Sequence, residues 1–473
     1  MLFAVITDLN SLDDLPSSID GVEVRLDYLF QLDDDKLFAV TQTSSLKVLF
    51  TLRTDTQGGL FQGSPMSYKK NIQRYLRFKP DIIDIEYWVD DDFLNEIKAS
   101  HPDVQILISY HHFGDNPPPV NIIVSELEKK NADIYKLIVE ALSHEYVFDL
   151  LSLQKEKQNK WITFCIGRHG SWSRVVAHIL GSYISYAFID SYQFEGQISL
   201  HDWLCVYHYP LLNRETKIYG VVGSPLEQSP GHWFHNRVMQ ESGYNGVYIK
   251  MPAETKDLPI LIAKMKEGLI KGLSVTIPFK EIIIPYIDSL DDKASLTQVV
   301  NTLVYEKESI KGYNTDIKGV EQALLAHLND KSRFVLLGGG ATAKSVLYVL
   351  SSHRKQIVCI SRRSGKPHFN FHVEGAFLNT KDVYTLPFHD LVIDATSCQD
   401  HFLLSGLKNS QIWKVNIDQN NLYHRINDYL NKNLEERKRF IQQNTCHDGF
   451  ILYLVQAHWQ SKLWGIESSK NPC

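Results

Sequence analysis

Residues 131–140 read NADIYKLIVE, a short apolar run typical of a buried strand, yet a lysine, Lys136, stands at its centre. Similar runs occur throughout the first half of the chain and number eight in all: LFAVI (2–6), GVEVRLD (21–27), KVLFTLR (47–53), DIIDIEY (81–87), VQILISYH (104–111), ADIYKLI (132–138), KWITFCI (160–166) and YISYAFI (183–189). Most gaps between them have room for one helix, so the region predicts alternating strands and helices. Eight such units indicate a compact (β/α)₈ TIM barrel, although an open α/β sheet would have the same spacing.

A second α/β region follows a short linker. Residues 211–216 are expected to be this linker, because a new alternation begins at Lys217 with KIYGVVGSP. At 473 residues the chain is also too long for one ordinary core. We therefore expect a barrel domain at 1–210 and a further α/β domain at 217–473.

The composition is that of a globular protein. Apolar residues make up 44% of the chain and charged residues 22%. The net charge of −6, without a basic block, argues against a nucleic-acid or anionic-membrane partner. The N-terminus, MLFAVITDLN, becomes acidic too soon for a signal peptide, and no apolar run reaches the ~18 residues of a membrane span. The six cysteines are scattered without a CxxC pair, so we expect a reduced, cytoplasmic chain and no metal site.

Two of the predicted strands carry charged side chains on one face. Alternation puts Glu23, Arg25 and Asp27 on one face of the second run, and Asp84 and Glu86 on one face of the fourth. Unpaired charges inside a packed barrel are costly. These residues therefore form a structural layer of ion pairs, or belong to a strand shifted by one residue, or line an active site.

Three further polar side chains stand near the ends of strands, namely Arg53, His111 and Lys136. Catalytic groups of barrels come from the carboxyl ends of strands, so the group indicates a catalytic site. A desolvated lysine near other cations has a lowered pKa and becomes a nucleophile for ketones. The alternative for Lys136 is a packed stem whose amine reaches solvent.

The ordered segments EVRLD, TLRTDTQGG, DIEY, SYHHF, ADIYKL, WSR and EGQ resemble type I 3-dehydroquinate dehydratases over roughly residues 1–208. The resemblance implies a (β/α)₈ barrel. It also implies that Lys136 forms a Schiff base with the C3 ketone of 3-dehydroquinate, and that His111, oriented by Glu86, moves the C2 proton and helps the C1 hydroxyl to leave. Arg174 would hold the substrate carboxylate. The residues implied to hold the hydroxyls and the imine region are Glu23, Arg25, Arg53 and Gln197.

A strand, a glycine turn and a helix start are predicted by RFVLLGGGATAKSV (333–346). Gly338 and Gly340 allow a tight turn and a close approach to a pyrophosphate, while Ala343 lets the helix pack on the strand. Ala341 lies in the same turn. The pattern therefore indicates a dinucleotide-binding unit.

The end of the next predicted strand indicates which dinucleotide binds. NAD-binding proteins carry an acidic residue there, whereas this chain reads Ser361, Arg362, Arg363. Two arginines suit a 2′-phosphate and favour NADP as the cofactor. The alternative is a solvated loop.

The segments GLSVTIPFKE and GYNTD supply Lys280 and Asp316, which taken singly would more often be surface residues. Together with VVGSP, QSP, VVNTL and the glycine turn, they resemble shikimate dehydrogenases over about 217–473. The resemblance implies a substrate subdomain (217–319 with a returning C-terminal helix at about 450–473) and a Rossmann-type NADP subdomain (320–449). Lys280 and Asp316 would be the catalytic pair. The implied substrate contacts are Ser229, Ser274, Thr276, Asn301 and Gln456, and the implied nicotinamide contacts are Thr396 and Gly449.

The loop GSPLEQSP (223–230) carries Glu227 where shikimate dehydrogenases commonly have the first serine of Ser-x-Ser-Pro. A second carboxylate facing the substrate carboxylate at ~4 Å would repel it by roughly 4 kcal/mol. We therefore expect Glu227 to point away, and Ser229 with another donor such as Ser224 to hold the substrate.

The sequence thus predicts one chain with two consecutive enzymes of the shikimate pathway. The first would convert 3-dehydroquinate to 3-dehydroshikimate, and the second would reduce that product to shikimate with NADPH. An alternative is a Schiff-base aldolase barrel joined to another NADP oxidoreductase. A sensor that keeps both pockets for binding is a non-enzymatic alternative, but binding alone needs no nucleophile or proton donor. The oligomeric state, and quinate as an additional substrate, stay open.

Overall fold

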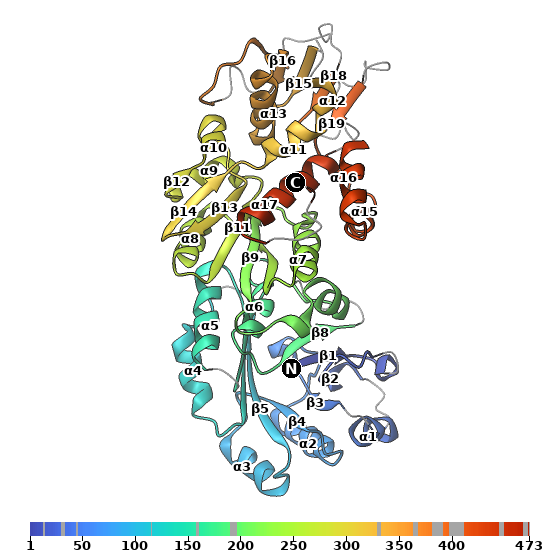
Figure 1. Ribbon diagram of the computed structural model, residues 1–473. Coiled ribbons are helices and arrows are strands. Elements are labelled where there is room, and N and C mark those ends of the chain that lie inside the picture. The colour runs from blue at the N-terminus through green and yellow to red at the C-terminus, as the bar shows by residue number, and fades with distance from the viewer. Residues whose placement is uncertain are drawn as a thin grey trace. The chain divides into compact units, whose positions relative to one another are not determined.

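The computed structural model describes the whole chain except residues 13–14, 30–33, 44–45, 115, 158–159, 190–195, 329–332, 363–367, 381–390, 397–410, 444–448, 467–471 and 473. The chain divides into two compact units, Met1–Thr216 and Lys217–Cys473 (Figure 1). The expected linker therefore falls at the end of the first unit. No helix within the described ranges combines the length and the hydropathy needed to cross a bilayer.

The first unit is a nearly closed barrel of eight parallel strands. The sheet order is β7-β6-β5-β4-β3-β2-β1-β8. Beside its two end strands, the backbone N–H of Tyr183 donates to the carbonyl of Trp161 at 3.1 Å. The barrel and all eight predicted strands are confirmed, and the open sheet is wrong. The strands are β1 (Leu2–Ile6), β2 (Gly21–Arg25), β3 (Lys47–Thr51), β4 (Ile82–Glu86), β5 (Gln105–His112), β6 (Ile134–Glu140), β7 (Trp161–Ile166) and β8 (Ser185–Phe188).

Helices follow most of these strands, and local sequence explains where three of them begin. The side chains of Ser64, Asp90 and Ser143 each accept a hydrogen bond from a backbone N–H in the first turn of the helix that follows. The helices are α1 (Asp34–Thr43), α2 (Pro65–Leu76), α3 (Asp91–Ser100), α4 (Val120–Glu128), α5 (His144–Glu156) and α6 (Ser173–Ile179). Short helical turns are η1 (Leu9–Leu12), η2 (Leu26–Tyr28), η3 (Asp55–Gln57), η4 (Asp202–Val206) and η5 (Tyr209–Leu211).

The second unit begins with a mixed sheet in the order β10-β9-β11-β13-β14-β12. Its strands are β9 (Lys217–Gly223), β10 (Gly246–Pro252), β11 (Ile270–Val275), β12 (Ser289–Leu290), β13 (Thr302–Glu306) and β14 (Ser309–Tyr313). The helical segments between them are α7 (Gly231–Ser242), η6 (Thr255–Asp257), α8 (Leu258–Lys266), α9 (Phe279–Ile282), η7 (Ile284–Tyr286) and α10 (Asp292–Thr297).

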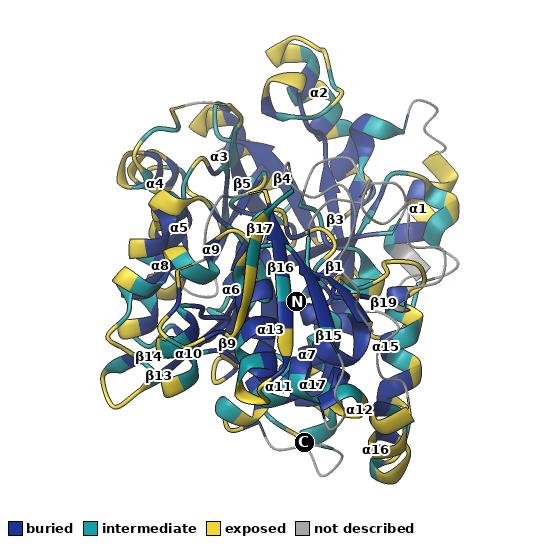
Figure 2. Cartoon of the chain, turned by 90° about the horizontal axis from the view of Figure 1, so that it is seen from above, coloured by how far each residue is buried: buried dark blue, intermediate teal, exposed yellow. Residues whose placement is uncertain are grey.

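A parallel five-stranded sheet, β17-β16-β15-β18-β19, forms the Rossmann-type part of this unit. Its strands are β15 (Arg333–Leu337), β16 (Gln356–Ser361), β17 (Gly375–Asn379), β18 (Leu391–Asp394) and β19 (Gln411–Lys414). The helices are α11 (Asp316–Ala323), α12 (Leu325–Leu328) and α13 (Ala341–Ser352). In Figure 2 the central strand β15 is mostly dark blue, whereas the edge strand β17 is largely yellow, as expected for a sheet covered at its centre.

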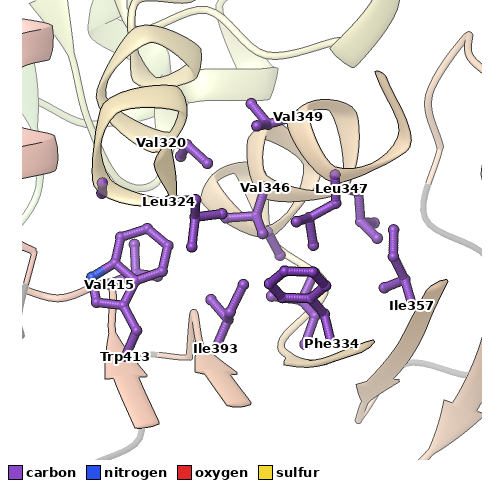
Figure 3. Packing of buried hydrophobic residues seen from close by; sticks show 14 of the residues in the cluster. Val320, Leu324, Phe334, Val346, Leu347, Val349, Ile357, Ile393, Trp413 and Val415 are labelled. Carbon is purple, nitrogen blue, oxygen red and sulfur yellow. The ribbon is translucent and has the colours of Figure 1, made fainter. Parts of the chain in front are cut away.

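The core on one side of this sheet joins strands and helices from distant parts of the sequence. Figure 3 shows the side chains of Phe334, Ile393 and Trp413, which come from the strands. These side chains pack against Val346 on α13 and Leu324 just after α11. All five are at most 1% exposed. This packing fixes α13 on the sheet, and with it the glycine turn that precedes the helix.

The chain then returns to the first sheet of the unit through α15 (Leu422–Leu430), α16 (Leu434–Gln443) and α17 (Phe450–Leu463). Residues of α15 and α16, such as Ile426 and Ile441, lie in the same core as Tyr219 on β9 and Phe234 on α7. The structure therefore places α15 and α16 with the substrate part, whereas the sequence assigned them to the nucleotide part.

Candidate active sites

Alternation along β6 turns Lys136 into the barrel, where it is only 4% exposed. Its Nζ lies 3.3 Å from Oε1 of Glu23 and 3.5 Å from Oδ2 of Asp84. The amine also lies over the ring of Tyr186, 4.3 Å from the ring centroid. The alternative of an amine that reaches solvent is therefore wrong.

A network of charges surrounds this lysine. Arg53 donates to Oδ2 of Asp84 at 2.5 Å and to Oγ of Ser109 at 2.6 Å, and Ser109 donates to the other oxygen of Asp84 at 2.5 Å. Burial alone would lower the pKa of Arg53, but Asp84 and Glu86 outweigh it and the pKa is raised. Arg53 and Lys136 share one carboxylate oxygen, so the lysine has both a cation and two carboxylates nearby. The ion pairs predicted for these strands are therefore present, and Arg53 and Lys136 among them also line the cavity.

Glu23 and Arg25, both on β2, are each held by a partner. Oε1 of Glu23 accepts a hydrogen bond from Oγ1 of Thr51 at 2.8 Å. Burial alone would raise the pKa of Glu23, but Lys136 and Arg25 outweigh it and the pKa is lowered. Arg25 donates to both oxygens of Asp27, at 3.0 and 2.8 Å. Asp27 lies just beyond the end of β2, so it reaches Arg25 from a helical turn rather than by strand alternation.

His111 enters the same cavity from β5. Its backbone N–H donates to Oε1 of Gln57 at 2.8 Å, and its Nδ1 has no hydrogen-bond partner among the described residues. Burial lowers the pKa of His111 well below its usual value, and Arg53 and Lys136 lower it further. The imidazole is therefore neutral near pH 7, as a general base must be.

Glu86 on β4 is fully buried, and other residues hold its carboxylate. Oε1 accepts from the backbone N–H of Thr54 at 2.8 Å, and Oε2 accepts from Oγ1 of Thr54 at 2.8 Å and from Nε1 of Trp88 at 2.7 Å. Glu86 and His111, both within the described residues, form neither a hydrogen bond nor an ion pair with each other. Its predicted role in orienting His111 stays a prediction.

Arg174 differs from the other charged residues of the site. It lies near the start of α6, is 9% exposed, and stacks over Phe164 with 4.1 Å between the guanidinium carbon and the ring centroid. Nε of Arg174 is buried without a hydrogen-bond partner, and no described residue forms an ion pair with the guanidinium. Burial lowers its pKa to about 10. Within the described residues, Arg174 is therefore a buried cation without an ion-pair partner.

These side chains line one cavity. Its walls include all the predicted residues of the barrel site except Glu86, namely Glu23, Arg25, Arg53, His111, Lys136, Arg174 and Gln197. They come from β2, the segment after β3, β5, β6, α6 and the segment after β8. Lys136, His111 and Arg174 thus line one common cavity.

In the second unit, the predicted lysine and aspartate meet. Nζ of Lys280 on α9 donates to Oδ2 of Asp316 at 2.5 Å, and Asp316 is the first residue of α11. Nδ2 of Asn301 donates to the other oxygen of Asp316 at 2.8 Å and to Oε1 of Gln456 at 3.3 Å. The Asn301 amide therefore orients the Asp316 carboxylate, and this carboxylate orients the Lys280 amine.

The remaining predicted substrate contacts differ in their burial and hydrogen bonds. Ser274 is buried and donates to Oε1 of Gln460 at 3.0 Å, and Gln460 donates to the backbone carbonyl of Asn301 at 3.1 Å. Thr276 follows β11 and is half-buried. Ser229 is half-buried at the start of α7, and no described hydrogen bond joins its side chain to the cluster. The structure thus joins Lys280, Asp316, Asn301 and Gln456 by hydrogen bonds.

The glycine turn has the local geometry expected for close approach of a phosphate. Gly338 has φ of +117°, and a Cβ there would lie 2.7 Å from the carbonyl oxygen of Ala395. Gly340 precedes α13 without a side-chain cap, and no atom lies within 4 Å of where its Cβ would be. Ala341 begins the helix and Ala343 is fully buried against the sheet. The first turn of α13 therefore has free N–H groups that an anion can approach.

The other predicted cofactor contacts lie at the ends of the neighbouring strands. Ser361 ends β16 and is buried, and Arg362 follows it exposed to solvent, while Arg363 lies outside the described residues. Thr396 follows β18, and its Oγ1 donates to Oδ1 of Asp394 at 2.7 Å. Gly449 precedes α17 and approaches the backbone of Val415 so closely that a Cβ would clash with its carbonyl. These residues lie at the edge where Rossmann-type sheets bind dinucleotides.

The chain matches two family models, "Type I 3-dehydroquinase" over residues 4–212 and "Shikimate dehydrogenase substrate binding domain" over residues 221–303. The shikimate biosynthesis protein AroDE of Chlamydia pneumoniae is 30% identical over 70% of this chain and 69% of that protein. The chain belongs to the AroDE family. Members of the family join a type I 3-dehydroquinase to a shikimate dehydrogenase, and a relative from Arabidopsis thaliana with both activities in its name is 26% identical over 72% of this chain and 60% of its own.

Solved structures similar to this AroDE chain include the dehydroquinate dehydratase and shikimate dehydrogenase of S. pombe AroM. That structure is 19% identical, covers 98% of this chain and 95% of its own, and has a TM-score of 0.38. A shikimate dehydrogenase in complex with NADP⁺ is 26% identical over 55% of this chain and 95% of its own, with a TM-score of 0.42.

The structure adds Ser109, Tyr186 and Gln460 to the predicted residues, and it gives partners to Asp27 and Asp84, which the sequence had placed on strand faces. Ser109 and Asp84 fix Arg53, and Asp27 fixes Arg25. Tyr186 lies against Lys136, and alternation along the YISYAFI run could have placed it inside the barrel. Gln460 has a weaker signal, since it stands one helical turn after Gln456 on α17.

Proposed function

We propose that this chain dehydrates 3-dehydroquinate through a Schiff base on Lys136 and then reduces the product, 3-dehydroshikimate, to shikimate with NADPH. The observation that supports the first step is the buried guanidinium of Arg174, which forms no ion pair with a described residue and lines the same cavity as Lys136 and His111. A substrate carboxylate would supply the missing anion. Family membership supports the pairing of the two reactions in one chain.

In the barrel, the Lys136 amine attacks the C3 ketone and the ketone oxygen leaves as water. The resulting imine nitrogen is cationic, and Glu23 and Asp84, which lie 3.3 and 3.5 Å from Nζ, stabilise its charge. The cation withdraws electrons, so the C2 proton becomes acidic enough for the neutral His111 to accept it. His111 then passes a proton to the C1 hydroxyl, which leaves as water. Hydrolysis of the imine frees the product and restores the lysine.

In the second unit, Lys280 donates a proton to the carbonyl oxygen of 3-dehydroshikimate. Asp316 holds the ammonium at 2.5 Å, and Asn301 holds Asp316, so the donor is fixed before the substrate arrives. Ser229, Ser274, Thr276, Asn301 and Gln456 are the proposed substrate contacts. The cofactor, when bound, supplies the hydride.

Residues around the glycine turn fit a dinucleotide. The open space at Gly340 and the uncapped first turn of α13 suit a pyrophosphate. Arg362, exposed just after β16, suits a 2′-phosphate and therefore NADP rather than NAD. Ser361, Arg363, Thr396 and Gly449 complete the proposed cofactor contacts.

Borohydride trapping tests the Schiff base. Borohydride should inactivate the dehydratase only when 3-dehydroquinate or its product is present, and the added mass should map to the peptide that contains Lys136. A label on another lysine would refute the assignment.

A crossed pair of variants tests the separation of the two sites. Lys136→Ala should abolish dehydration and leave shikimate oxidation largely intact, and Lys280→Ala should do the reverse. Each variant is the folding control for the other, because the lysines lie in different compact units. Loss of both activities from one folded variant would contradict the proposal.

A further inference from the structure

One hydroxyl in the barrel cavity has no hydrogen-bond partner among the described residues. Tyr186 lies on β8, is 7% exposed, and lines the cavity together with Lys136 and Arg174. Its hydroxyl oxygen is buried and makes no hydrogen bond to any residue within the described ranges. A buried polar group without a partner destabilises the folded protein, and phenylalanine would fill the same space without that cost. A hydroxyl at this place is therefore best explained by a ligand that binds it.

Its neighbours show which part of the ligand it faces. The ring of Tyr186 lies beneath the Lys136 amine at 4.3 Å, and on another side it contacts Phe164, with 6.3 Å between ring centroids. Phe164 in turn lies beneath the guanidinium of Arg174 at 4.1 Å. Tyr186 thus belongs to a continuous row of contacts that joins the nucleophile to the unpaired cation.

The hydroxyl in this row is a donor. Burial raises the pKa of Tyr186 well above its usual value, and the carboxylates of Glu23 and Asp84 raise it further. The phenol is therefore neutral at any pH at which the enzyme would work, and it can give its proton to an oxygen atom of a ligand.

We propose that Tyr186 is a further substrate-binding residue of the dehydratase, and that its hydroxyl donates a hydrogen bond to an oxygen on C1 of the bound substrate. This inference rests on the proposed function. Lys136 is joined to C3 and Arg174 holds the carboxylate on C1, so the row between them spans C1 to C3. Along that span C2 carries only hydrogen, whereas C1 carries the carboxylate and the hydroxyl that leaves. Tyr186 therefore has its acceptor at C1.

The test is Tyr186→Phe, which keeps the ring beneath Lys136 and removes only the hydroxyl. The value of kcat/KM for dehydration should fall by about tenfold or more, as for loss of a hydrogen bond to a charged group. The thermal unfolding midpoint of the unliganded chain should stay the same or rise, because an unpartnered buried group has been removed. Borohydride should still label Lys136, and shikimate oxidation should not change.

Tyr146→Phe is the matched control. That hydroxyl donates to the carbonyl of Pro118 at 2.8 Å and does not line this cavity, so its removal should leave kcat/KM unchanged and lower stability slightly. A kcat/KM of Tyr186→Phe within twofold of the wild-type value would overturn the inference. A fall in kcat/KM that only accompanies a fall in the unfolding midpoint would also overturn it, since a structural role predicts that result. Failure of borohydride to label wild-type Lys136 would refute the proposed function instead.

Discussion

Removing the charge of Arg174, whose guanidinium forms no ion pair with a described residue, should raise the stability of the free protein and lower its dehydratase activity. The lowering of its pKa from 12.5 to about 10 corresponds to roughly 3 kcal/mol against the charged form in the free protein. Stacking on Phe164 already offsets part of the cost of burial, on the order of 1 kcal/mol. Arg174→Met keeps the apolar stem and removes the charge. We expect the free protein to become more stable by about 1–2 kcal/mol.

The same change should damage dehydration. A charge-assisted hydrogen bond to the substrate carboxylate is worth about 1.5–3 kcal/mol, and a guanidinium can make two of them. We expect kcat/KM to fall by roughly two to three orders of magnitude, since about 1.4 kcal/mol corresponds to tenfold. The rate is followed by the absorbance of the conjugated ketone that forms, and stability is followed by calorimetry. The unfolding transition of the barrel is recognised in the calorimetric trace because its midpoint temperature rises when 3-dehydroquinate or its product is added.

Arg25→Met is the control, because Arg25 has an anionic partner that Arg174 lacks. Its removal leaves the fully buried carboxylate of Asp27 without its ion pair, so the barrel should lose on the order of 3 kcal/mol of stability. A less stable Arg174→Met protein whose kcat/KM stays within about threefold of the wild-type value would refute the reasoning. It would mean that the guanidinium has a structural partner and does not bind substrate.

Three further predictions concern His111, the cofactor and the serine loop. Because the pKa of His111 is lowered, the imidazole stays neutral as the pH falls. The value of kcat/KM for dehydration should therefore stay level down to pH ~6.5 and decline only at lower pH. A decline centred above pH ~6.5 would contradict the assignment of His111 as the base. Arg362→Glu should weaken NADPH binding by about 1.5–3 kcal/mol and NADH binding far less, and an equal loss for both would place the side chain elsewhere. Glu227 is exposed and its backbone carbonyl accepts a hydrogen bond from Lys250 at 2.9 Å, so Glu227→Ser should change the Michaelis constant for shikimate by less than about threefold. Ser229→Ala should raise that constant by roughly tenfold, and the reverse pattern for the two variants would show that the loop is aligned wrongly.

The sequence alone determined the features that depend on neighbouring residues. Each strand of the barrel is a short apolar run, and alternation along it decides which side chains face inward; this is why Glu23, Lys136 and His111 could be placed in the interior. The glycine turn before α13 is equally local, because Gly338 needs its positive φ whatever packs around it. The family resemblance then assigned chemistry to residues already placed inside.

Only the tertiary structure decided which of these residues meet and which stay unpaired. Gln456 reaches Asn301 from a helix 155 residues further along the chain, and no local pattern encodes that contact. The return of α15 and α16 to the core of β9 and α7 likewise depends on long-range packing, because an amphipathic helix can cover either sheet. Pairing of β3 with β4 brings Asp84 to Arg53. Among the described residues, Nε of Arg174 and the hydroxyl of Tyr186 are left without a hydrogen-bond partner. Whether a group lacks a partner depends on every residue around it. The row of contacts from Lys136 to Arg174 could therefore be recognised only in the folded barrel.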